Sequence, residues 1–171
     1  MLGPVQNIAT MAARFSAVMG WVALVIMAVI STVDVLGTAL FNKPVTGAFE
    51  MAGEALAVVV FLGLLQTQIL RAHITVDLLT ERLRGVPSRL LDVLATLAMT
   101  LAIGMIAAQT WPQMMESWRI GELAPGAFNF PVYPIKTLVC LGATGAVLVA
   151  ALQTLQALLR LFGIGADHDA D

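Results

Sequence analysis

The side chains that could do chemistry gather in one stretch of the sequence, Glu50–Leu83. Glu50 and Glu54 open it four residues apart, so both lie on one face of a helix. An apolar run follows, and Gln68 continues the same face before the charged residues begin. Carboxylates inside a membrane can carry protons or ions, which makes both glutamates candidates for ion coupling. They can equally serve assembly by contacting a cation of another helix, and the sequence leaves both interpretations open.

The residue inventory argues against four kinds of functional site. A buried haem commonly needs paired histidine ligands, but the two histidines are His73, beside charged residues, and His168, near the carboxyl terminus. Thiol–disulfide exchange needs a cysteine pair, and Cys140 is the single cysteine of the sequence. Neither an HExxH zinc motif nor a glycine-rich phosphate loop occurs. We therefore expect no catalysis and no cofactor bound to this chain.

The composition is that of a membrane protein. Apolar residues make up 59% of the chain and charged residues 12%, and the mean hydropathy is +0.90, whereas soluble domains have about 25% charged residues. The net charge of −2, without a basic patch, argues against nucleic acid as a partner. About 20 apolar residues cross the hydrocarbon core as a helix. We expect one all-α integral membrane domain, 1–171, with four transmembrane helices at about 15–41, 47–70, 89–111 and 131–162.

The segment after the second span is too charged to cross a membrane. Over 71–84, apolar residues fall on one side and charged residues on the other, which predicts a short helix lying at the membrane surface. The acidic tail, 163–171, is expected to be flexible. Near the cytoplasmic interface, one set of residues is expected to contact phospholipid headgroups: Arg71, His73, Asp77, Arg82, Arg84 and Arg89.

The distribution of cations predicts the topology. Four spans place both termini on one side, which also carries the arginines at 14, 71, 82, 84, 89 and 160. The other side carries Lys43, Arg119 and Lys136. Because cytoplasmic loops are enriched in Lys and Arg, both termini should be cytoplasmic, and Glu50 and Glu54 should face outward with the loop expected over 112–130.

Polar groups lie mainly at the ends of the spans rather than at their middles. A self-sufficient transporter usually has broken helices and a polar site at the bilayer midplane. Here one polar stripe follows the second span, which is typical of a subunit that docks on a larger membrane protein. The expected partner or assembly contacts are Asp34, Glu50, Glu54, Phe61 and Gln68. The alternative is a small homo-oligomeric ion-coupled carrier or channel that uses Glu54.

A particular order of motifs runs through nearly the whole chain. Residues 61–79 read FLGLLQTQILRAHITVDLL, and 121–136 read GELAPGAFNFPVYPIK, with prolines at 131 and 134. In this order the sequence resembles the small membrane subunit of tripartite ATP-independent periplasmic (TRAP) transporters, of the DctQ type. The residues at 71, 73, 74, 76 and 77 are similar to that family's R-x-x-H-I-x-V-D pattern, with one residue fewer between arginine and histidine.

The resemblance implies a three-part, sodium-driven transporter in the bacterial inner membrane. A periplasmic solute-binding protein would capture an organic acid, such as a C4-dicarboxylate or a sugar acid. A large polytopic permease subunit would bind the solute and sodium, and the present chain would be its scaffold and help dock the binding protein. The residues expected to face the binding protein from the periplasmic loop are Glu116, Trp118, Arg119 and Glu122.

Overall fold

Four long helices make up almost all of the described chain. The computed structural model describes residues 3–70, 86–124 and 129–162. The helices are α1 (Gly3–Phe41), α2 (Ala48–Ile69), α4 (Val86–Ile120) and α5 (Tyr133–Leu161). Each is long and apolar enough to cross a membrane, and the described residues form no strand beyond one isolated bridge. The all-α, four-span prediction is confirmed. The expected surface helix over 71–84 and the tail 163–171 lie outside the described residues.

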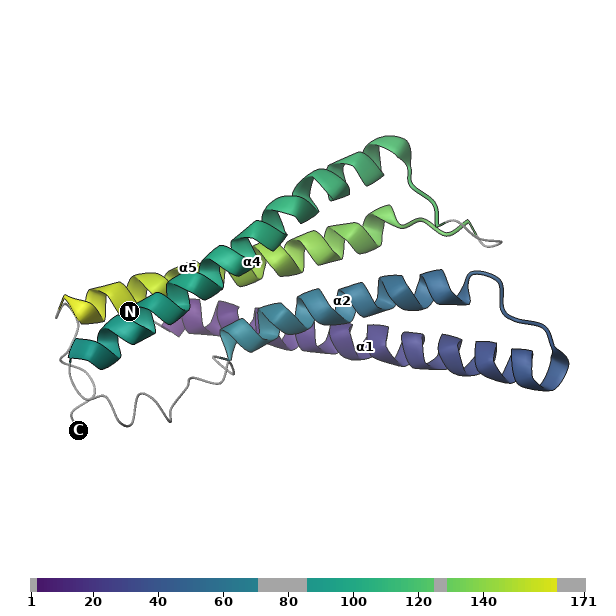
Figure 1. The fold of residues 1–171 in the computed structure, drawn as a ribbon, viewed down its shortest axis with the longest axis horizontal. Coiled ribbons are helices and arrows are strands. Elements are labelled where there is room, and N and C mark those ends of the chain that lie inside the picture. Colours follow the sequence, from purple (N-terminus) through teal and green to yellow (C-terminus); the bar gives the residue numbers. More distant parts are fainter. Residues whose placement is uncertain (1–2, 71–85, 125–128, 163–171) are drawn as a thin grey trace.

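The helices are arranged as two hairpins side by side (Figure 1). Helix α1 packs against α2, α2 against α5, and α5 against α4, so α2 and α5 are the inner pair. The inner pair runs parallel, and each member is antiparallel to its outer neighbour. We call the end with the turns 42–47 and 121–132 the hairpin end. The opposite end, where α1 begins and α5 finishes, is the terminal end.

Small side chains let α2 and α5 approach closely. A Cβ atom added at Gly142 of α5 would lie only 2.8 Å from the carbonyl oxygen of Phe61, and one added at Gly145 would lie 3.0 Å from Leu65 Cδ1. Close backbone approach of this kind is how membrane helices gain packing energy without a hydrophobic driving force. The buried face of α5 consists largely of small residues: Cys140, Gly142, Ala143, Ala146, Ala150, Thr154 and Ala157.

The third span extends further than the sequence predicted. We expected it to end near Trp111, with a loop over 112–130, but α4 continues through Pro112 to Ile120. A proline interrupts one backbone hydrogen bond, and membrane helices tolerate this because local adjustment satisfies the freed carbonyl. The residues that follow Pro112, Gln-Met-Met-Glu, are good helix formers. The expected loop is therefore much shorter.

Backbone hydrogen bonds fix the turn between α4 and α5. After Gly121, which has a positive φ of 60°, the Ala124 N–H donates to the Phe130 carbonyl at 2.9 Å. The Val132 N–H donates to the Glu122 carbonyl at 3.0 Å. These bonds fold the turn back on itself and place Glu122 beside the first turn of α5.

Candidate functional site

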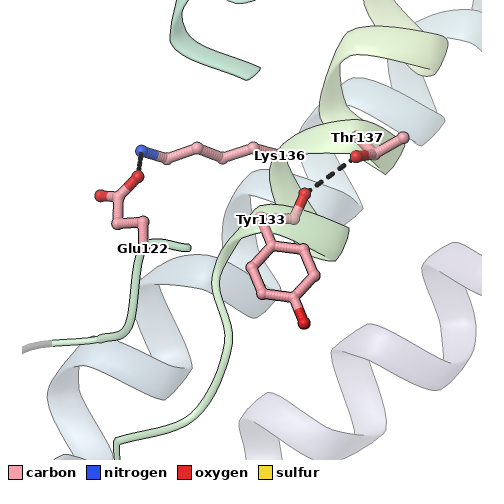
Figure 2. Close-up of polar contacts among 4 residues, drawn as sticks. All are labelled: Glu122, Tyr133, Lys136 and Thr137. Atoms are coloured by element: carbon pink, nitrogen blue, oxygen red, sulfur yellow. Dashed lines mark hydrogen bonds and ion pairs between the residues drawn. The ribbon is translucent and has the colours of Figure 1, made fainter. Parts of the chain in front are cut away.

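An ion pair joins α5 to the turn before it at the hairpin end. The Lys136 Nζ of α5 donates to Glu122 Oε2 at 2.5 Å, as Figure 2 shows. The Lys136 charge also acts on Glu54, which is part-buried on α2. The hydrogen bond from Lys136 lowers the pKa of Glu122 below its ordinary value of 4.5. Lys136 therefore joins α5 to the turn before it, and its charge also reaches α2.

Trp118 is held in a fixed position by α5. Its Nε1–H donates to Thr137 Oγ1 at 2.8 Å, and its ring centroid lies 4.5 Å from that of Tyr133. The Thr137 hydroxyl in turn donates to the Tyr133 carbonyl at 2.8 Å (Figure 2). More than half of the Trp118 surface remains exposed. The hairpin end thus presents a rigid aromatic side chain.

The residues expected in a periplasmic loop divide between a helix and a turn. Glu116, Trp118 and Arg119 lie on the last turns of α4, and Glu122 lies in the turn itself. Arg119 Nη2 donates to Glu116 Oε1 at 2.7 Å, and both side chains are exposed. The structure brings all four residues to the hairpin end, but on a longer helix than the sequence suggested.

Asp34 stabilises the turn between α1 and α2. Its Oδ1 accepts a hydrogen bond from the Val45 N–H at 2.7 Å. The turn begins at Asn42, whose φ of 50° reverses the chain after α1, and the Lys43 N–H closes the helix end on the Gly37 carbonyl at 3.1 Å. The structure therefore gives Asp34 a role within the chain. Glu50 lies in the first turn of α2, where the helix dipole favours a carboxylate.

Gln68 lies inside the chain, at the junction of three helices. It has no exposed surface, and its Nε2 donates to Met99 Sδ of α4 at 3.2 Å. Its backbone carbonyl accepts a hydrogen bond from Gln153 Nε2 of α5 at 2.7 Å. The next residues along α4 and α5, Thr100 and Thr154, share a hydrogen bond of 2.9 Å between their hydroxyls. The expectation that the Gln68 side chain contacts a partner subunit is wrong, because neighbouring helices bury it.

Part of the polar stripe on α2 also faces α5. The backbone carbonyl of Phe61 lies against Gly142, and the Lys136 charge acts on Glu54. Both side chains are only part-buried, so the expected partner contacts of Glu54 and Phe61 stay predictions.

Of the residues expected at the cytoplasmic interface, the structure describes Arg89, which joins α4 to α5. Arg89 Nη1 donates to the Arg160 carbonyl at 3.4 Å, close to the carboxyl end of α5. A cation there is favourable because the end of a helix carries partial negative charge. The remaining members of the set lie outside the described residues: Arg71, His73, Asp77, Arg82 and Arg84.

Two functional features were missed in the sequence. The first is the small-residue face of α5, where Gly142, Ala146, Ala150 and Thr154 recur every four residues. This small-xxx-small pattern is typical of a close contact between membrane helices. The second is Gln153, which had no signal beyond being a polar residue in an apolar span.

The match to a family model covers most of the chain. Residues 27–162 match the model described as Tripartite ATP-independent periplasmic transporters, DctQ component. The chain belongs to the DctQ family. No curated protein matches it. DctQ proteins are small subunits of TRAP transporters in the bacterial inner membrane, and the family is one of transporter subunits rather than of enzymes. The sequence-based family prediction is therefore confirmed.

Proposed function

We propose that this DctQ subunit is a scaffold for the large transport subunit of a sodium-driven TRAP transporter for organic acids. The observation that supports this role is the open arrangement of the helices. The two hairpins meet along α2 and α5, and no more than a third of the most apolar window of any span is buried within the chain. Broad apolar helix faces are thus available to a larger membrane protein.

In this proposal the solute and sodium sites belong to the large subunit. Around the turn between α4 and α5, the charges that could bind a carboxylate or a cation are matched within the chain. Lys136 is paired with Glu122, and Arg119 is paired with Glu116. The transported acid, a C4-dicarboxylate or a sugar acid, would then be selected by the binding protein and the large subunit.

Copurification with the large subunit tests the scaffold role. A tagged DctQ chain should retain the large subunit through detergent washes when both are expressed together. The apolar faces are the surface to alter: Val60→Asn places an amide on an exposed position of α2, and Leu148→Asn does so on α5. Loss of the large subunit with one variant, and not with the other, would locate the contact. Failure of the wild-type chain to copurify would contradict the proposal.

The proposed topology puts the hairpin end in the periplasm. It rests on the excess of arginines at the terminal end, which is the expected cytoplasmic side. Cysteine labelling tests it in a Cys140→Ala background, since Cys140 is buried. An impermeant maleimide added from the periplasm should label Thr46→Cys, in the exposed turn, and leave Ser88→Cys at the start of α4 unlabelled. The reverse pattern would overturn the topology.

The hairpin end is also the proposed contact for the periplasmic binding protein. Glu116, Trp118, Arg119 and Glu122 would form part of that surface. The double variant E116R/R119E reverses the charges while keeping the ion pair within α4. In the reconstituted transporter, it should lower uptake several-fold at limiting binding protein and much less at saturating binding protein. Equal uptake by the wild type and the variant at all concentrations would rule out this contact.

The proposed role gives Glu54 a structural task. In the alternative, a homo-oligomeric carrier, Glu54 would be the ion site and would have to release its partner during transport. Glu54 is part-buried on α2 within reach of the Lys136 charge, and this supports the structural task. E54Q should therefore leave the sodium dependence of uptake by the full transporter unchanged. A shift in the sodium dependence would support the alternative.

A further inference from the structure

The described arginines differ in their partners between the two ends of the molecule. At the hairpin end, Arg119 and Lys136 each form an ion pair with a glutamate, whereas Lys43 forms none within the described residues. At the terminal end, Arg14, Arg89 and Arg160 have no carboxylate partner among the residues that the structure describes. All three arginines are exposed. An unpaired guanidinium in this position can bind an anion from its surroundings.

Two of these arginines lie next to each other on neighbouring helices. Arg89 is in the first turns of α4, and Arg160 is in the last turn of α5. The hydrogen bond of 3.4 Å from Arg89 Nη1 to the Arg160 carbonyl fixes the two helix ends side by side. A guanidinium has five N–H donors, so this bond leaves Arg89 with donors to spare. Asp92 lies one turn beyond Arg89 but forms no ion pair with either arginine within the described residues.

The length of α5 places this pair at the depth of lipid headgroups. Between Lys136 and Arg160, the helix rises about 36 Å at 1.5 Å per residue. The hydrocarbon core is about 30 Å thick, and about 40–45 Å with the headgroup regions. With Lys136 at one boundary, Arg160 lies among the headgroups of the opposite leaflet. The nearby apolar surface is suitable for acyl chains, because Leu90, Leu94 and Leu159 are exposed.

We propose that Arg89 and Arg160 together bind the phosphate of an anionic phospholipid. Guanidinium groups match phosphate oxygens in a two-pronged geometry. Basic sites between transmembrane helices are suited to anionic headgroups. Two helices contribute to the site, so the bound lipid bridges the ends of α4 and α5 beside the existing hydrogen bond. The site depends on membrane insertion alone and not on the scaffold role.

Native mass spectrometry of the full chain, released from nanodiscs of phosphatidylglycerol and phosphatidylethanolamine, tests the site. The wild-type chain should retain phosphatidylglycerol in preference to the zwitterionic lipid. R89Q and R160Q should each lower this retention about five-fold, the effect of one charge near the membrane surface. R14Q is the matched control, because it removes one exposed arginine from the same end of the molecule, and this arginine has no ion pair within the described residues. It should retain the lipid as the wild type does.

Two further arms keep the test decisive. R89K and R160K retain the charge but lose the two-pronged guanidinium, so they should retain more lipid than R89Q and R160Q and less than the wild type, which separates lost binding from lost folding. Millimolar inorganic phosphate should not displace the lipid. An equal loss of lipid in R14Q, unchanged retention in R89Q and R160Q, or displacement by free phosphate would each overturn the proposal.

Discussion

The charged side chains at the two ends of this DctQ subunit have different kinds of partner. At the hairpin end, Arg119 and Lys136 have carboxylate partners from the chain itself, and backbone hydrogen bonds fix both turns. At the terminal end, the arginines have no carboxylate partner in the described part, and Arg89 contacts the carboxyl end of α5 instead. Within the described residues, ion pairs thus stabilise only the hairpin end.

The two hairpins contact each other where α2 crosses α5, and disrupting this contact should have the largest effect on stability. In Gly142→Leu the side chain would collide with the backbone at Phe61, where even a Cβ atom comes within 2.8 Å. We expect overpacking to cost about 3 kcal/mol or more, seen as a large fall in the thermal denaturation midpoint in detergent. Gly104→Leu is the matched control, since nothing lies within 4 Å of its added Cβ atom. Equal destabilisation of both variants would contradict the close crossing.

The polar junction between α2, α4 and α5 should show a smaller effect, and its two glutamines should contribute unequally to stability. Gln153→Leu removes the donor to the Gln68 carbonyl and should cost about 0.6–1.7 kcal/mol, the range for hydrogen bonds between membrane helices. Gln68→Leu should cost less, because it removes a weak bond to sulfur together with a buried Oε1 that has no partner. Gln109→Leu, at an exposed position on α4, is the control. In chemical denaturation, Gln153→Leu should lose the most unfolding free energy. A larger loss for Gln68→Leu would contradict this expectation.

The Lys136–Glu122 ion pair should make the stability of the fold depend on pH. The pKa of Glu122 is lowered in the folded chain by Lys136, so the pair stabilises the fold above the ordinary pKa of 4.5. This stability is lost as the pH falls from about 4.5 through the lower folded pKa. For a partly exposed pair, the effect is up to about 1 kcal/mol. At pH 6, K136Q should have a lower thermal denaturation midpoint than the wild type. Between pH 6 and pH 3, its midpoint should fall by less than that of the wild type. K43Q, with no ion pair in the described residues, should follow the wild type.

The anchoring of Trp118 should have the smallest effect. Trp118→Phe keeps the ring contact with Tyr133 but loses the N–H bond to Thr137. Because the site is largely exposed, we expect a loss of about 0.5 kcal/mol. Trp111→Phe is the control, since its exposed ring has no hydrogen bond in the described structure. A shift in the denaturation midpoint for Trp111→Phe as large as that for Trp118→Phe would show that the N–H bond contributes nothing.

Hydropathy predicted the fold well because a bilayer requires about 20 apolar residues per span, and four such runs are present. Pairwise contacts were harder to predict. The stripe from Glu54 to Gln68 was visible, but the same polarity suits a contact with another subunit or with another helix of the same chain. The helix beyond Pro112 was missed because proline was given more weight than the helix formers after it. The Lys136–Glu122 pair could not be predicted, because it depends on how the turn after Gly121 places Glu122 beside α5.

Reconstitution into liposomes tests the central claim most directly. The full DctQ chain, the large subunit, and the two together would be compared for uptake of an organic acid driven by a sodium gradient, with the binding protein added outside. The scaffold role predicts no solute or sodium flux from this chain alone and full uptake only when both subunits are present. Sodium-driven flux from the DctQ chain alone, abolished by E54Q, would contradict it.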